Sequence, residues 1–202
     1  MPVYPDVDML DVCGPYEMFR WAGIAVDLVA VAPGAIPFGR GFSFNVPDAL
    51  PAPAPYDAIW VPGGDPAALA RIIADPQSPL LAFIRAQAAQ STYVCSVCEG
   101  CLLLAAANLI DGYTVTTHWA FIPYLLQRYP QVTVADGHPR YVLDRNRLTG
   151  GGISSGLDEA LKLIELLLGT AAAQSVQQTT QYYPDPPVQS AIPNTITSPM
   201  PD

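Results

Sequence analysis

Short runs of apolar and β-branched residues alternate along the chain with longer segments in which apolar residues recur every three or four positions. The short runs predict strands at Val26–Ala32, Tyr56–Gly64, Ser91–Val97, Tyr113–Trp119, Arg140–Asp144 and Arg147–Gly152. The longer segments predict helices at Pro15–Trp21, Leu80–Gln90, Gly100–Leu109, Ala120–Tyr129 and Leu157–Leu168. Nearly continuous apolar strands separated by helices favour a mostly parallel sheet that is covered on both faces. The pattern therefore predicts a doubly wound α/β fold.

Three details sharpen this prediction. The helix Gly100–Leu109 is apolar all round, which is typical of a buried helix. Pro15 suits the first turn of its helix, where a backbone N–H has no partner to lose. Arg145 and Asn146 separate the last two strands and predict a hairpin turn between them.

Two segments show no periodicity. Residues Pro47–Tyr56 form an extended, proline-stiffened connection, and Tyr183–Asp202 contain six prolines. We therefore divide the chain into one α/β domain, residues 1–182, and a proline-rich tail, residues 183–202. The tail is either disordered or an arm laid on a neighbouring subunit.

Composition narrows the class of protein. The chain has 202 residues, half of them apolar, and this amount of apolar surface is typical of a globular domain. A net charge of −9 argues against nucleic acid or an anionic membrane as partner. There is no apolar run long enough to span a bilayer and no basic, apolar start typical of a secretory signal. Four cysteines do not resemble a disulfide framework, so we expect a cytoplasmic protein.

Cys95, Cys98 and Cys101 are evenly spaced in YVCSVCEGCLLL, Tyr93–Leu104. One interpretation is a zinc or iron–sulfur site with Cys13 as the fourth ligand. A strand rises about 3.3 Å per residue, so Cys95 and Cys98 would lie roughly 10 Å apart in a strand, too far for one ion. Since free cysteine is mostly buried, packing is the ordinary alternative for all three thiols. We therefore expect no metal here.

A strand–elbow–helix explains the same stretch better. Cys98 then occupies a bend between the strand Ser91–Val97 and the helix Gly100–Leu109, where a nucleophile stands clear of both elements. Gly100 supplies the small residue that such a tight turn requires. Reactive groups in open α/β sheets lie at the carboxyl ends of strands. We therefore predict that Cys98 is reactive and that the helix N-terminus lowers its pKa.

Few side chains can assist this thiol. His118 follows a predicted strand and is either a catalytic partner or a packed histidine, whereas His138 lies in a loop as exposed polar surface. Asp11 and Glu99 can hold the thiol or shuttle a proton, and burial would raise the pKa of either carboxyl group. Their structural alternatives are a helix cap for Asp11 and a first-turn anion for Glu99.

Two glycine-rich turns follow other predicted strands. The turn PGGDP, with Gly64 and Asp65, offers backbone amides for an oxyanion-type hole opposite Cys98. The turn TGGGISSG, Thr149–Gly156, permits close approach of the backbone. No Gly-Lys-Ser/Thr sequence follows it, so a phosphate loop is disfavoured. Both turns are expected to shape a tight pocket.

The ordered motifs VPGG, YVCSVCEGCLLLAAANLIDGYTVTTHW and LTGGGISSGLDEALKLI resemble the PfpI/ThiJ superfamily, which has the class I glutamine-amidotransferase-like fold. Within it, YPDVDMLDVCGPYEMF, TTHW, LTGGGI and the tail QYYPDPPVQSAIPNT are similar to the isocyanide hydratase branch. The resemblance covers nearly the whole chain. The nearest sister group is the ligand-binding half of some AraC-type regulators.

The resemblance implies a flavodoxin-like homodimer without a cofactor that adds water to an isocyanide and releases an N-formamide. Cys98 matches the nucleophile, which forms a thioimidate, and Asp11 matches the acid/base aspartate. Gly151 and Ile153 match residues that line the pocket. To these expected substrate contacts we add Gly64, Asp65, His118 and Trp119.

One departure from this branch is Glu99, because a threonine usually follows the nucleophile. A second carboxylate beside Cys98 raises the pKa of the thiol unless Glu99 is protonated or turned away. We therefore count Glu99 among the catalytic residues. Glyoxalase/deglycase-like or amidase-like chemistry stays an alternative, as does a non-catalytic redox or ligand-binding module built on Cys98.

Overall fold

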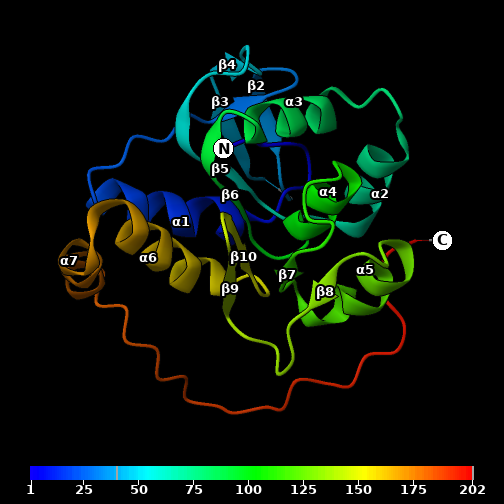
Figure 1. Ribbon diagram of the computed structural model, residues 1–202. Coiled ribbons are helices and arrows are strands. Elements are labelled where there is room, and N and C mark those ends of the chain that lie inside the picture. Colours follow the sequence, from blue (N-terminus) through cyan, green and yellow to red (C-terminus); the bar gives the residue numbers. More distant parts are fainter. Residues whose placement is uncertain (40, 202) are drawn as a thin grey trace.

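A sheet runs through the middle of the molecule, with helices on both sides (Figure 1). The computed structural model describes residues 1–39 and 41–201. Within these ranges the order of strands in the central sheet is β5 (Tyr56–Val61), β6 (Ser91–Ser96), β10 (Arg147–Gly150) and β9 (Tyr141–Asp144). The strands β5, β6 and β10 are parallel, and β9 is antiparallel to β10. The predicted flavodoxin-like α/β fold and the hairpin are confirmed.

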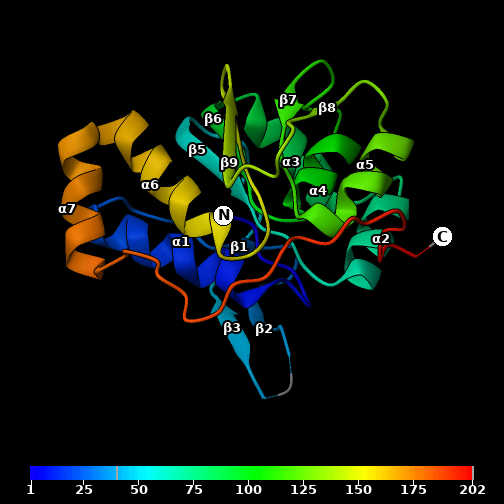
Figure 2. The same cartoon turned by 90° about the horizontal axis from the view of Figure 1, so that it is seen from below.

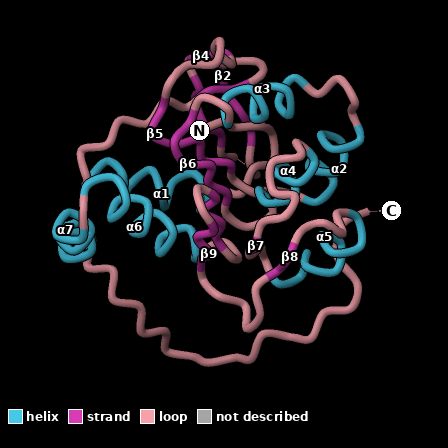
Figure 3. Tube along the Cα trace, in the orientation of Figure 1, coloured by secondary structure: helices cyan, strands magenta, loops and turns pink. Residues whose placement is uncertain are grey.

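Alternate residues of the sheet feed two separate cores. Ile59 and Val61 of β5 belong to one hydrophobic cluster, and Trp60 between them belongs to the other. The first cluster lies under α2 (Pro66–Ala74), α3 (Pro79–Ala88), α4 (Gly100–Ala106) and α5 (Ile122–Arg128). The second lies under α1 (Met9–Trp21), α6 (Ser155–Leu168) and α7 (Thr170–Thr180). Figure 2 shows these two helical layers from below, and Figure 3 separates them from the loops by colour.

Short strand pairs lie outside the central sheet. The pairs are β1 (Val29–Ala30) with β4 (Asp48–Ala49), β2 (Gly34–Pro37) with β3 (Ser43–Val46), and β7 (Thr114–Val115) with β8 (Thr133–Val134). The expected strands Val26–Ala32 and Tyr113–Trp119 were therefore predicted too long. After Val115 the chain turns into a 3-10 helix, η1 (Trp119–Phe121), so His118 ends no strand.

The first helix begins at Met9, well before the predicted Pro15, which lies inside it. Proline has no N–H, so the carbonyl group of Asp11, four residues earlier, loses its helical partner. The indole Nε1 of Trp60 donates a hydrogen bond of 3.1 Å to this carbonyl oxygen. The buried tryptophan thus makes an interior proline tolerable, and Asp11 is brought into the helix.

Helices α2 and α7 were not predicted. In α2 the side chain of Asp65 accepts hydrogen bonds from the N–H groups of Ala67 and Ala68, and Pro66 fits the first helical position. In α7 polar residues dominate, and Val176 is its buried residue among those described. No helix in the described ranges is both long and apolar enough to cross a membrane.

Gly100 offers a test of the packing between α4 and β5. A Cβ atom there would overlap the carbonyl oxygen of Val61, which is backbone and cannot swing away. We expect Gly100→Ala to lower the free energy of unfolding in urea by about 3 kcal/mol. Gly14→Ala is the control, because a Cβ there meets only the flexible side chains of Leu157 and Leu10. Equal unfolding midpoints for the two variants would contradict this account.

Candidate active site

Cys98 occupies the bend between β6 and α4 in a strained backbone conformation. Its φ is 57°, in the left-handed region that residues with a Cβ rarely adopt. Its N–H donates to the carbonyl groups of Gly150 (3.2 Å) and Gly151 (2.9 Å). Its own carbonyl oxygen accepts from the hydroxyl group of Thr117 at 2.8 Å. Three hydrogen bonds therefore hold the predicted elbow, and they come from β10 and from the segment before η1.

The thiol of Cys98 is buried and forms two hydrogen bonds. The N–H of Ile153 donates to Sγ at 3.3 Å, and Oδ2 of Asp8 lies 4.0 Å from Sγ as an acceptor for the thiol. Ile153 itself has a φ of 33°, and its strained turn aims this N–H at the sulfur. An N–H group directed at sulfur stabilises the thiolate relative to the thiol, so the site has one donor for a developing negative charge.

Asp11 enters the site from the first turn of α1 and is fully buried. Its Oδ2 accepts a hydrogen bond of 2.9 Å from the N–H of Gly63. Its Oδ1 has no hydrogen-bond partner among the described residues. The carboxyl group is therefore anchored by one oxygen while the other stays available.

Glu99 follows the elbow and is turned inward, with only 4% of its surface exposed. Its Oε2 has no hydrogen-bond partner among the described residues. Gly63 separates the carboxyl groups of Glu99 and Asp11, and a Cβ at Gly63 would overlap Oε2 of Glu99. A glycine at this position is therefore what lets both acids stand beside the thiol.

Together these side chains form a compact acidic cluster of Asp8, Asp11, Cys98 and Glu99. One ligating atom from each lies within 4.8 Å of the others. Cys95 and Cys101 are not part of this cluster and belong instead to different hydrophobic clusters, and Cys13 is exposed. The evenly spaced cysteines therefore do not converge, and packing accounts for Cys95 and Cys101.

Burial and mutual repulsion raise the pKa values of the groups in this cluster. Burial, and then the charge of Asp8, raise the pKa of Asp11 well above its ordinary value. Burial, and then the charges of Asp11 and Glu99, raise the pKa of Cys98 well above that of a free thiol. The predicted lowering of the Cys98 pKa is therefore wrong, because desolvation and two carboxyl groups outweigh the short helix α4 and the Ile153 N–H. Burial raises the pKa of Glu99 to about 7.

The turn PGGDP has fewer backbone N–H groups available for a substrate than expected. The N–H of Gly63 is used by Asp11, and the N–H of Asp65 donates to the carbonyl group of Asp6 at 2.9 Å. The side chain of Asp65 is exposed and caps α2. Gly64 packs against Tyr4 and Val7 and shares a cavity wall with Glu99. This turn positions Asp11 and Glu99, and we find no support in it for an oxyanion hole.

His118, Trp119, Gly151 and Ile153 lie around a second cavity of about 350 Å³. His118 packs between Trp119 and Phe121, with ring centroids 5.0 and 5.6 Å away, and its Nδ1 accepts from the N–H of Ala120. Burial lowers its pKa. The interpretation as a packed histidine therefore fits better than a catalytic partner, and His138 is exposed as expected.

Two acids of the site region were missed from the sequence. Asp8 is at the N-cap position of α1 but makes no capping hydrogen bond, and its side chain faces Cys98 instead. The spacing of Asp8 and Asp11, three residues apart at a helix start, is the signal that places both on one face. Glu159 on α6 is fully buried against Gly150, and burial raises its pKa well above the ordinary value. A lone acid on the apolar face of that helix was its signal.

Comparisons with known proteins agree in one family. The profile of the DJ-1/PfpI family matches residues 1–166. The chain is 39% identical over 201 residues to the isonitrile hydratase of Pseudomonas putida, covering 99% of this chain and 85% of that protein. It is 30% identical over 149 residues to the HTH-type transcriptional regulator GbdR of Pseudomonas aeruginosa, covering 73% of this chain but only 37% of the regulator. The crystal structure of a ThiJ/PfpI family protein from Pseudomonas syringae superposes with a TM-score of 0.84 at 31% identity, covering 93% of this chain and 76% of that one.

The pKa of Glu99 predicts a pH dependence of stability. The folded protein binds this proton more tightly than the unfolded chain does, so the free energy of unfolding falls as pH rises from 4.5 to about 7. We expect Glu99→Gln to abolish this contribution to the decrease in the free energy of unfolding, about 3 kcal/mol. Urea unfolding at pH 5 and pH 8 measures it. The control Glu17→Gln changes an exposed acid of α1 and should leave the pH dependence as it is. A parallel pH dependence in Glu99→Gln and the unsubstituted protein would contradict the expectation.

Proposed function

Because the chain belongs to the DJ-1/PfpI family, we propose that it is a cysteine-dependent hydratase that converts an isocyanide into an N-formamide. The observation that carries the proposal is a buried thiol that contacts an N–H donor and shares a 4.8 Å cluster with three carboxyl groups. Similarity to an isonitrile hydratase over almost the whole chain supports the substrate class.

In the proposed first step, the sulfur of Cys98 attacks the terminal carbon of the isocyanide. A carboxyl group gives its proton to the same carbon and takes up the thiol proton, giving the thioimidate R–N=CH–S–Cys98. Asp11 is assigned this proton transfer, because its Oδ1 is unpartnered among the described residues while Oδ2 is anchored by Gly63. The Ile153 N–H stabilises negative charge on sulfur as the bond forms.

In the second step, water adds to the thioimidate carbon. A carboxylate takes one proton from this water, and the imine nitrogen receives a proton. The C–S bond then breaks and the sulfur leaves with the electron pair. The proton of the new hydroxyl group passes to the sulfur as the C=O bond forms, and R–NH–CHO is released. The sum is one isocyanide plus one water to one formamide, so no cofactor is needed.

Glu99 is assigned a supporting role through its charge. Protonated, it adds no negative charge beside the thiol, whereas ionised it raises the pKa of Cys98 further. A carboxyl group whose pKa is about 7 is also well matched to proton transfer near neutral pH. The same residue motivates the second candidate, a glyoxalase/deglycase-like or amidase-like activity, because the isocyanide hydratases that this chain resembles usually have threonine there.

A homodimer is part of the proposal. Helix α1 presents Met9, Leu10, Tyr16 and Trp21 to solvent, each 36 to 51% exposed. This row of apolar side chains on one helix is typical of an association surface. Its N-terminal end, with Met9 and Leu10, also carries Asp8 and Asp11, so an interface there would lie close to the acidic cluster.

Removing the nucleophile tests the proposal directly. We expect Cys98→Ala to lower formamide production from cyclohexyl isocyanide by at least about 1,000-fold. Chromatographic quantification of the formamide measures it. Cys13→Ala, which changes the exposed cysteine, should keep the full rate. Normal turnover by Cys98→Ala would exclude covalent catalysis by this thiol.

Glu99 predicts the alkaline limb of the pH–rate profile. We expect kcat/KM for the isocyanide to fall above about pH 7, because ionised Glu99 opposes formation of the thiolate. The limb should be absent in Glu99→Gln and in Glu99→Thr. The same variants are also assayed with glyoxal and amide substrates. If Glu99→Thr loses activity on these substrates and gains isocyanide turnover, the second candidate function is supported.

A further inference from the structure

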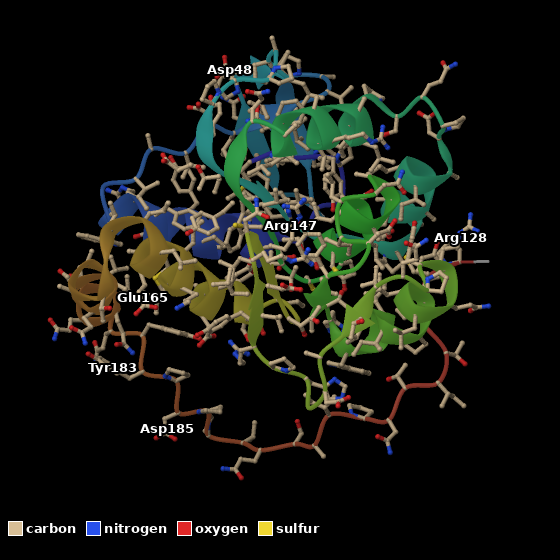
Figure 4. The ribbon with its side chains drawn as sticks, in the orientation of Figure 1. Asp48, Arg128, Arg147, Glu165, Tyr183 and Asp185 are labelled. Carbon is tan, nitrogen blue, oxygen red and sulfur yellow. The ribbon has the colours of Figure 1, made fainter. Side chains whose placement is uncertain are left out.

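The tail has a defined path across the protein, although residues 183–201 form no helix or strand. It leaves α7, runs along the outside of the molecule and ends beside α5 and α2 (Figures 1 and 2). Figure 4 labels Tyr183 and Asp185 where the tail starts and Arg128 close to where it ends. The described tail therefore starts at α7 and ends against α5 and α2 of the same chain.

Both ends of this segment are anchored. At the start, the hydroxyl group of Tyr182 donates to Asp158 at 2.8 Å, and Arg140 donates to the same hydroxyl oxygen at 3.3 Å. At the far end, Met200 is only 7% exposed and shares a cavity wall with Ile73 of α2 and Tyr124 of α5. Two fixed points define the course of the residues between them.

Between the anchors, Ile192 lies over the cavity of about 350 Å³. Its exposure is 47%, whereas Val188 and Ile196 on either side are 77% and 91% exposed. Ile192 is the tail residue that lines this cavity, opposite residues that include His118, Trp119 and Ile153. Among the described tail residues, a single apolar side chain therefore makes the contact with this cavity.

The cavity adjoins the reacting atoms. It is lined by Gly151 and Ile153, whose carbonyl and N–H groups bind the Cys98 N–H and Sγ respectively. Arg140 also donates to the carbonyl group of Ser154 at 2.8 Å, so one side chain holds both the loop that touches the thiol and the start of the tail. Arg140 thus connects the start of the tail to the loop that contacts the thiol.

The sequence of the tail suits a fixed strap. Six of its residues are proline, which limits the conformations available to the free segment and lowers the entropy lost when it is anchored. Two of its apolar residues, Ile192 and Met200, lie where it meets the protein, whereas Val188 and Ile196 are largely exposed.

We propose that residues 183–201 form the outer wall of the substrate pocket, and that Ile192 limits the size of the group carried by the isocyanide nitrogen. This inference rests on the proposed function, since the pocket is assigned to the substrate of Cys98. It makes the tail a specificity determinant of the enzyme.

Size-matched substrates test the proposal. We expect Ile192→Ala to raise kcat/KM for 2-naphthyl isocyanide about tenfold relative to that for isopropyl isocyanide, because the wall recedes. Ile192→Trp should lower kcat/KM for the naphthyl compound by a similar factor and spare the isopropyl compound. Ile196→Ala is the matched control, since this isoleucine of the same tail is 91% exposed. Identical size selectivity in the Ile192 and Ile196 variants would overturn the proposal.

A second measurement needs no turnover. In a Cys13→Ser background, alkylation of Cys98 by iodoacetamide and by N-(1-pyrenyl)maleimide is followed by peptide mass spectrometry. Ile192→Ala, and Met200→Asp, which releases the far anchor, should each accelerate the bulky reagent about tenfold relative to the small one. If the unsubstituted protein hydrates no isocyanide but this ratio rises, the proposed function fails while the strap stands. Unchanged ratios in both variants overturn the strap, whatever the activity.

Discussion

Cys98 has a strained backbone conformation that two neighbouring segments hold in place. A left-handed φ of 57° costs free energy, and the carbonyl groups of Gly150 and Gly151 and the hydroxyl group of Thr117 compensate for it by binding both ends of the Cys98 peptide unit. Since Gly150 ends β10 and Gly151 follows it directly, the parallel pairing of β6 with β10 is a condition for the elbow. The strand pairing that defines the fold therefore also sets the backbone conformation of Cys98.

A second constraint joins the elbow to the first helix. Pro15 leaves the carbonyl group of Asp11 without its helical partner, and Trp60 of β5 satisfies it. The next turn of chain after β5 places the N–H of Gly63 on the Asp11 side chain. One strand thus fixes both the backbone and the carboxyl group of this acid. Burial of the acid follows from that fixation, and its raised pKa follows from burial.

The sequence predicted the parts of the molecule that local patterns determine. The strands β5, β6 and β10 and the elbow at Cys98 come from short apolar runs and from glycine placement. Contacts between segments that are distant in the sequence could not be predicted from these local patterns. The start of α1 was misplaced because Trp60, not the helix itself, compensates Pro15, and α7 was missed because its polar face outweighs Val176. The sign of the Cys98 pKa shift was wrong for the same reason: the helix N-terminus is visible in the sequence, and the acids from α1 and their burial are not.

The surroundings of Glu99 accommodate a carboxyl group beside the buried thiol. A carboxyl group at this position needs room, and Gly63 provides it, because any Cβ there would overlap Oε2. It also needs a way to avoid three negative charges around one thiol, and burial provides that by keeping a proton on the group up to about pH 7. In this state Glu99 adds no negative charge beside the thiol, which favours the proposed attack on an isocyanide carbon. As Glu99 ionises, its charge opposes formation of the thiolate, so in the proposed mechanism this residue couples the chemistry to pH.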